Sequence, residues 1–185
     1  MDRFARVILG YHGCEEEFAR SLLDGSQPIA EWKPSMNEYD WLGHGIYFWE
    51  HSPSRARRWA EDQECRRPDV VGAVIQLGRC FDLLNEEITG LLPGTYNLLE
   101  ASFQDAGQPL PENRGAAGKL RNLDCLVIND CLNRLRGKGI EYDTVRGAFL
   151  EGDAAYPNAG FARETHIQIA VLNPDCILGI FRPNL

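Results

Sequence analysis

The sequence predicts a single α+β domain that spans residues 1–185. Apolar, β-branched segments stand near both ends of the chain, and segments with helical periodicity lie between them. The length fits one compact domain with a hydrophobic core of its own. Apolar residues make up 44% and charged residues 25% of the chain, which are values typical of an ordinary globular protein.

The first half of the chain predicts three strands and two helices. Strands are expected where short apolar runs end at turn residues, and these runs cover residues 5–11, 45–50 and 69–78. Acidic residues open the helix predicted at residues 15–24, and a glycine ends it. Ser52 and Pro53 supply the N-cap and the first turn of a helix predicted at residues 52–67. Residues 26–43 predict a long loop, which in a compact domain usually carries function.

The second half predicts a long helix and further strands separated by loops. A stripe of leucines at helical spacing predicts a helix at residues 118–137, and residues 95–106 predict a shorter one. A short element is expected within residues 79–94, and a loop rich in Gly, Pro and Asn at residues 107–118. Another loop is expected at residues 151–163. The remaining strands are predicted at residues 142–150, 165–172 and 175–182.

The composition limits what the protein binds and where it works. A net charge of −8 disfavours a wide nucleic-acid-binding surface, and only the basic runs at 55–58 and 134–138 are candidates for a small basic patch. The six cysteines show neither a CxxC pair nor zinc-ligand spacing, which predicts reduced, mostly buried thiols and no metal site. Glu141, Asp143 and Arg146 are expected to be surface charges. No membrane-spanning or secretory pattern is visible, so a cytoplasmic protein without a membrane partner is expected.

Two segments in the first half combine residue types that suit a ligand site. Tyr11-His12-Gly13 follows the first apolar run, where an imidazole and free peptide groups can face a ligand. Residues 41–49 place two glycines among aromatic residues, so that a planar ligand can approach the backbone and stack on a ring. Each segment alone also fits a plain structural role, either a turn or a strand edge with core aromatics.

A row of polar residues is predicted on the penultimate strand. Within residues 163–168, strand alternation puts Glu164, His166 and Gln168 on one face of an otherwise apolar strand. Such a row is typical of the floor of a cleft, and a solvated sheet face is the plainer interpretation. Glu164 is the only carboxylate in the row.

Taken together, these segments resemble the catalytic domain of the poly(ADP-ribose) polymerase-like, or diphtheria-toxin-like, ADP-ribosyltransferases. That family has a His-Gly on its first strand, then a helix, a variable loop and a Gly-x-Tyr-Phe strand followed by another helix. The residues that match in order are His12, Gly13, Gly45, Tyr47 and Phe48. The resemblance is good over residues 5–85 and weak over residues 163–182. It implies an ADP-ribosyltransferase-like fold, in which two packed, mainly antiparallel sheets with flanking helices surround an NAD cleft.

The resemblance also implies NAD as the substrate and a role for each matching residue. His12 would hydrogen-bond a ribose of NAD, the Gly13 backbone would hold the nicotinamide amide, and Tyr47 would stack on the nicotinamide ring. A glutamate on the late strand would stabilise positive charge at the anomeric carbon, which an oxocarbenium-like transition state requires. Because nicotinamide is a good leaving group, no metal is expected. Further NAD contacts are implied for Tyr11, Tyr39, Trp41, Gly45, Phe48 and Ser52.

The position of that glutamate depends on how the last two strands are aligned with the family. Alignment by the turn at Pro174 puts Gln168 in the catalytic place. Alignment by the junction of loop and strand puts Glu164 there, with His166 between the two on the same face. We choose Glu164, because the reaction needs a carboxylate and it is the only one on that strand.

The helix after the Gly-x-Tyr-Phe strand departs from the family pattern. The family often has a serine there that holds the nicotinamide amide, and a stacking aromatic residue a little later. This chain has Arg55 and Arg58 at the corresponding positions. Ser52, Ser54 and Trp59 lie close enough in sequence to take over those roles.

The activity predicted from these residues is mono-ADP-ribosylation, in which ADP-ribose passes from NAD to a macromolecule and nicotinamide is released. The acidic net charge favours a protein acceptor over nucleic acid or a small molecule. By resemblance, the loop at 151–163, with Tyr156 and Phe161, recognises that acceptor. The alternatives are an NAD glycohydrolase of the toxin or defence-effector type, a non-catalytic module that binds NAD or ADP-ribose, and a purely structural protein. The sequence does not indicate an oligomeric state.

Overall fold

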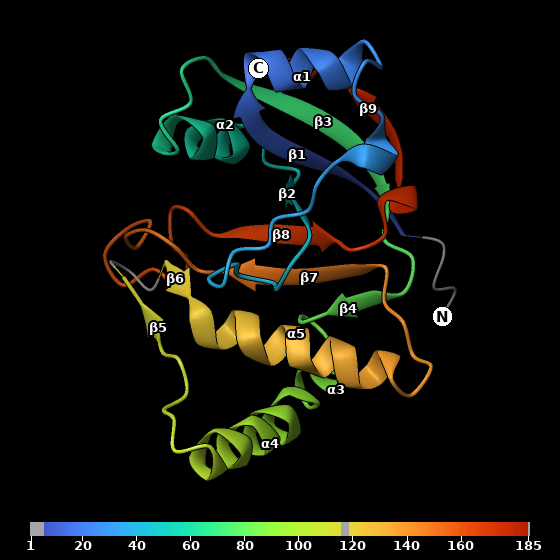
Figure 1. Cartoon of the computed structure of the whole chain (residues 1–185). Helices are drawn as coiled ribbons and strands as arrows, with labels where there is room; N and C mark the ends of the chain where they lie inside the picture. Colours follow the sequence, from blue (N-terminus) through green and yellow to red (C-terminus); the bar gives the residue numbers. More distant parts are fainter. Residues whose placement is uncertain (1–5, 116–118, 185) are drawn as a thin grey trace.

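Seven strands form one mixed sheet in the order β4-β7-β8-β2-β1-β3-β9 (Figure 1). The computed structural model describes residues 6–115 and 119–184. Within these residues β4 and β7 pair in parallel, and the other pairs of the large sheet are antiparallel. The strands are β1 (Val7–Glu15), β2 (Ile46–Glu50), β3 (Pro68–Gln76), β4 (Cys80–Asp82), β7 (Thr144–Phe149), β8 (His166–Val171) and β9 (Ile177–Phe181). A separate ribbon joins β5 (Asn113–Arg114) to β6 (Leu120–Arg121).

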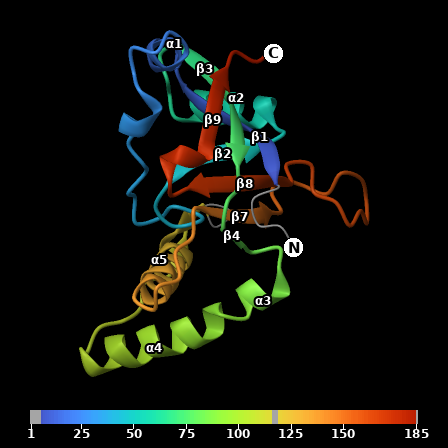
Figure 2. The same cartoon turned by 90° about the vertical axis from the view of Figure 1, so that its right-hand side faces the viewer.

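Helices cover the sheet in different places. Helix α1 (Glu16–Leu23) packs on the face of β3 that carries Val71, whereas α2 (Pro53–Asp62) packs on the face that carries Val70. Because neighbouring strand residues point to opposite faces, the two helices lie on opposite sides of the sheet. Helix α5 (Asn122–Arg136) covers β4, β7 and β8, and α4 (Leu92–Asp105) packs on α5 as an outer layer (Figure 2). The one-turn helix α3 (Glu86–Thr89) precedes α4.

The sheet bends between β1 and β2. Nine residue pairs join β1 to β3, whereas β1 and β2 are joined at Gly10–Glu50 and Tyr11–Trp49. Beyond Tyr11 the two strands diverge, so β1, β3 and β9 form one half and β2, β8, β7 and β4 form the other (Figure 1). The prediction of two separate packed sheets was therefore wrong, because this short pairing keeps both halves in one hydrogen-bonded sheet.

The α+β class is confirmed, and the predicted elements are present with shifted ends. Strand β1 runs on to Glu15 and includes the segment that was expected to be a turn. Helix α2 ends at Asp62, five residues earlier than predicted, and Glu64 then adopts a positive φ of 55°. Ala5 and the loop residues 116–118 lie outside the described residues. Four of the six cysteines are buried. None of the described helices is both long and apolar enough to cross a lipid bilayer.

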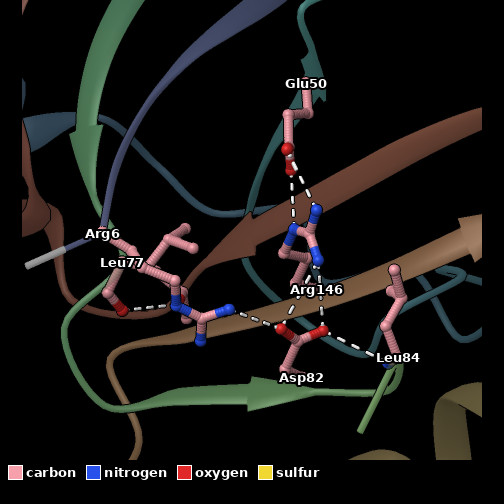
Figure 3. Close-up of polar contacts among 7 residues, drawn as sticks. Arg6, Glu50, Leu77, Asp82, Leu84 and Arg146 are labelled. Carbon is pink, nitrogen blue, oxygen red and sulfur yellow. Dashed lines mark hydrogen bonds and ion pairs between the residues drawn. The ribbon is translucent and has the colours of Figure 1, made fainter. Parts of the chain in front are cut away.

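A network of charges links strands β2, β7 and β4 within one half of the sheet, and Arg6, just before β1, joins it from outside (Figure 3). Arg146 of β7 donates from Nε and Nη2 to the two carboxylate oxygens of Glu50, at 2.7 and 3.0 Å. Its Nη1 lies 3.4 Å from both carboxylate oxygens of Asp82, to which Arg6 Nη1 also donates at 2.7 Å. The prediction that Arg146 is a surface charge was wrong, since its side chain is only 14% exposed. Asp143 is likewise engaged, accepting from the Arg79 N–H at 2.8 Å.

Candidate functional site

A crevice of about 530 Å³ lies beside the divergence of β1 and β2. His12 bridges the two strands there, because its Nδ1 lies 2.8 Å from the backbone oxygen of Tyr47. A carbonyl oxygen only accepts hydrogen bonds, so Nδ1 carries the proton and Nε2 keeps a lone pair. Burial lowers the pKa of His12, which keeps the ring neutral near pH 7. The strand residue thus presents a neutral imidazole to the crevice.

All four tryptophans of the chain line this crevice. They are Trp32, Trp41, Trp49 and Trp59. The His12 ring meets Trp32 edge to face at a centroid distance of 4.9 Å, and Trp49 and Trp59 lie 5.6 Å apart. The indole N–H of Trp49 is buried without a hydrogen-bond partner among the described residues. Walls of this kind favour planar ligands, which bury apolar area against the rings.

Tyr47 fixes the loop at residues 35–45 from inside the crevice. Its hydroxyl donates to the Gly43 oxygen at 2.6 Å and accepts from the Leu42 N–H at 2.8 Å. Burial raises the pKa of Tyr47 well above its usual value, so the hydroxyl stays protonated. Because the hydroxyl is committed to the loop, the ring is the part of Tyr47 available for a ligand.

Helix α5 holds the same loop from the other side. Asn129 Oδ1 accepts from the His44 N–H at 3.0 Å. Gly43 has a φ of 75°, and a β-carbon at this position would lie 2.5 Å from that same oxygen. A glycine is therefore required at the point where the loop crosses α5.

Asp40 is a buried carboxylate in the wall formed by this loop. It accepts from the Ser35 hydroxyl at 2.9 Å and from the Asn37 N–H at 3.1 Å. Burial raises the pKa of Asp40, and these two hydrogen bonds oppose the rise. Its bonds stay within the loop, so Asp40 shapes the wall.

A second carboxylate, Glu151, enters the crevice from the loop after β7. Its side chain is only 9% exposed and forms a short ion pair with Arg55 of α2. The nearest Glu151 oxygen also lies 3.6 Å from His166 Nδ1. The ion pair with Arg55 compensates the negative charge of Glu151, which would be costly to bury without a partner.

His166 and Gln168 lie next to Glu151 on one face of β8. His166 Nδ1 donates to the Glu164 backbone oxygen at 2.7 Å, and its Nε2 accepts from Gln168 Nε2 at 2.9 Å. Burial lowers the pKa of His166, consistent with this neutral form. The amide nitrogen of Gln168 is committed to His166, so its oxygen is the atom left to accept from a ligand.

Glu164 does not lie on the predicted strand face. Strand β8 begins at His166, and the Glu164 N–H instead donates to the Glu151 backbone oxygen at 3.0 Å, closing a loop. The Glu164 side chain is 37% exposed, bonds to Arg58 at 2.9 Å and does not line the crevice. The strand alternation that predicted its placement begins two residues later than expected, at His166, because Glu164 still belongs to the loop.

Half of the predicted site residues meet in the crevice. Those that line it are His12, Tyr39, Trp41, Gly45, Tyr47 and Gln168. The predicted residues outside its lining are Tyr11, Gly13, Phe48, Ser52, Glu164 and His166. A β-carbon on Gly13 would lie 2.0 Å from the Ala56 oxygen, so this glycine serves the packing of α2 on β1. Phe48 is fully buried in the core, and Tyr11 packs against Phe181.

Sequence reasoning missed Glu151 and the pairing of Arg55. One signal was available, because Glu151 directly follows the strand predicted at residues 142–150, and strand ends are common positions for functional carboxylates. The arginines at 55 and 58 do not form a free basic patch, since both pair with carboxylates. In the described part of the chain, no three His, Cys, Asp or Glu side chains gather closely enough to hold a metal ion.

Comparison with known proteins identifies a similar protein but no activity. No protein-family model matches the chain. It is 26% identical over 203 aligned positions to the uncharacterized protein MJ0359 of Methanocaldococcus jannaschii. The match covers 96% of this chain and 87% of the archaeal protein. The similarity therefore covers nearly the whole chain, and the function has to be argued from the site.

Proposed function

We propose that the protein binds NAD in the crevice and transfers its ADP-ribose part to an acceptor, with release of nicotinamide. One observation carries the proposal: a neutral histidine, a cluster of aromatic rings and the carboxylate of Glu151 line the same crevice of about 530 Å³. Ligand sites commonly have volumes of about 300–1,000 Å³. In this proposal the bent sheet is an ADP-ribosyltransferase-like fold.

Binding would use the aromatic walls for the two planar bases of NAD and polar groups for its sugars. The Nε2 lone pair of His12 accepts a hydrogen bond from a ribose hydroxyl, because Nδ1–H is committed to Tyr47. The Gln168 oxygen provides a second acceptor for a sugar hydroxyl. Lys33 and Lys119 also line the crevice and are suitable partners for the pyrophosphate.

The chemistry asks the protein to stabilise a sugar cation. The bond between the anomeric carbon and the nicotinamide nitrogen breaks, and its electron pair leaves with nicotinamide. The acceptor then forms a bond to that carbon and loses a proton. A carboxylate facing the anomeric carbon stabilises the positive charge that develops in between. Glu151 suits this role better than Glu164, because it lines the crevice and Glu164 points to Arg58.

A second candidate function is a module that binds NAD or ADP-ribose without turnover. Two observations favour it. Gln168, which has no charge, occupies the strand beneath the crevice, and Glu151 is neutralised by Arg55. A carboxylate held by an arginine stabilises a cation less than a free one does, because the two charges largely cancel.

Incubation of the purified protein with doubly labelled NAD tests these functions. Release of labelled nicotinamide together with an adenylate-labelled acceptor from lysate supports transfer, and release with free ADP-ribose supports hydrolysis. Binding without nicotinamide release supports the module. Glu151→Gln should lower the rate of release by about 10²–10³-fold, whereas Glu61→Gln, on the exposed side of α2, should leave it unchanged. If NAD neither binds nor turns over, the proposal is wrong.

A further inference from the structure

Arg55 is placed between two carboxylates and satisfies them unequally. Its Nη2 pairs closely with Glu151, whereas its Nη1 lies 3.8 Å from a Glu164 oxygen. The remaining donor, Nε, is buried and has no hydrogen-bond partner among the described residues. The guanidinium therefore has one full bond, one ion-pair contact beyond hydrogen-bond range, and one unused donor.

The two carboxylates are held side by side by the backbone. Glu151 and Glu164 close the base of one loop through the Glu164 N–H, which donates to the Glu151 oxygen at 3.0 Å. The Glu164 side chain packs against Gly152, where a β-carbon would lie 2.8 Å from its Cγ. Glu164 also bonds to Arg58, whose side chain is half exposed. Two positive and two negative charges thus lie together, and of these Arg55 and Glu151 line the crevice.

We propose that Glu164 is a positioning residue that takes Arg55 over from Glu151 when Glu151 turns toward the substrate. This inference rests on the proposed function, in which Glu151 is the catalytic carboxylate. The Arg55 side chain is 15% exposed, so its charge needs a carboxylate partner in either arrangement. Glu164 already lies within ion-pair distance, and a small rotation of the guanidinium exchanges one partner for the other. Glu151 is then free of its neutralising partner, and Arg55 is not left unpaired.

Two variants separate this role from a merely structural one. Glu164→Gln and Arg58→Gln both remove the same salt bridge, the 2.9 Å contact between Arg58 and Glu164. Their effects on Arg55 are opposite. Glu164→Gln leaves Arg55 with Glu151 as its one carboxylate, whereas Arg58→Gln leaves Glu164 with Arg55 as its one arginine.

Steady-state kinetics on the full chain measure the first consequence. We expect Glu164→Gln to lower kcat at least tenfold with a KM for NAD within threefold of the wild type. We expect Arg58→Gln to keep kcat within twofold. Equal losses in both variants would mean that the bridge is only structural, and the inference would be overturned while the proposed function stands.

A crystal structure of the Arg58→Gln variant gives a readout that needs no activity. The substitution is at a half-exposed position, so the fold should be retained. We expect the distance from Arg55 Nη1 to Glu164 to shorten from 3.8 Å into hydrogen-bond range. An unchanged position of Arg55 on Glu151 overturns the inference. If the distance shortens but NAD is not consumed, the exchange is real and the proposed activity is wrong.

Discussion

Two clusters in this protein each contain two arginines and two carboxylates, and they differ in how completely they are bonded. The Arg146 cluster consists of Arg6, Glu50, Asp82 and Arg146 (Figure 3). The Arg55 cluster consists of Arg55, Arg58, Glu151 and Glu164. All three guanidinium nitrogens of Arg146 have partners, whereas Nε of Arg55 has none in the described residues.

The difference follows the position of each cluster. No member of the Arg146 cluster lines the crevice, and its bonds cross β2, β7 and β4. Hydrogen bonding to Glu50 raises the pKa of Arg146 further, as expected of a closed network. Arg55 and Glu151 line the crevice. An unpaired buried donor costs about 1–3 kcal/mol. The Nε of Arg55, unpaired among the described residues, therefore lowers stability at the place where a ligand is proposed to bind. A complete cluster resists change, whereas an incomplete one has room for a second arrangement.

The largest expected effect is on the complete cluster. Arg146→Met leaves Glu50 and Asp82 buried without their central cation, and should lower the free energy of unfolding by about 3–5 kcal/mol. Denaturation in urea measures this loss. The matched control is Arg57→Met, which removes an exposed pair with Glu61 on α2 worth about 0.3–0.5 kcal/mol. A loss from Arg146→Met as small as the control's would show that the network does not hold the sheet together.

In the incomplete Arg55 cluster, loss of a carboxylate should lower activity strongly and stability only moderately. Glu151→Gln should lower kcat for nicotinamide release by about 10²–10³-fold, since it removes a preorganised charge. Arg55 keeps Glu164 nearby, so the free energy of unfolding should fall by less than with Arg146→Met. Measuring both quantities on both variants makes the comparison direct. Wild-type turnover in Glu151→Gln would remove the distinction between a structural and a functional cluster.

A smaller effect is expected on the crevice wall formed by the loop at residues 35–45. Asn129→Ala removes the acceptor of the His44 N–H and should lower the free energy of unfolding by about 1 kcal/mol. Because the loop carries Trp41 and Tyr39 into the crevice, the Kd for NAD should rise several-fold. Tryptophan fluorescence reports binding, since all four tryptophans line the crevice. An unchanged Kd would mean that α5 does not control this wall.

The smallest expected effect is a pH dependence of stability that comes from His12 and His166. The pKa values of His12 and His166 are lowered below 6.5 in the folded protein, so the unfolded chain binds more protons between those values and about pH 6.5. Stability should therefore fall as pH drops below about 6.5. The Arg146 cluster contains no histidine. Melting temperatures from pH 7.5 to 5 should show a shallower decline in His166→Gln, and an unchanged slope would contradict this assignment.

The sequence predicted the secondary-structure elements and the histidine and aromatic residues of the site. Apolar periodicity identified the strands and helices, and motif order identified His12 and Tyr47, which meet across the divergence of β1 and β2. These features are local, because each is set by spacing within a short segment. The bend of the sheet was not predictable, since it depends on how few residues of β1 and β2 pair.

The charged side of the site was not predicted because its partners are distant in sequence. Arg55 and Glu151 lie 96 positions apart, and so do Glu50 and Arg146. Alternation placed Glu164 on β8, but alternation cannot show where a strand begins. Arg146 was predicted to be a surface charge because its carboxylate partners, Glu50 and Asp82, lie on other strands, and the local strand pattern does not reveal them.

The most direct test of the account is a crystal structure with a non-hydrolysable NAD analogue. We predict that the analogue occupies the crevice, that His12 Nε2 accepts from a ribose hydroxyl, and that Glu151 faces the anomeric carbon with Arg55 moved toward Glu164. An analogue bound elsewhere, or a crevice that stays empty at saturating concentration with Arg55 still on Glu151, would contradict it.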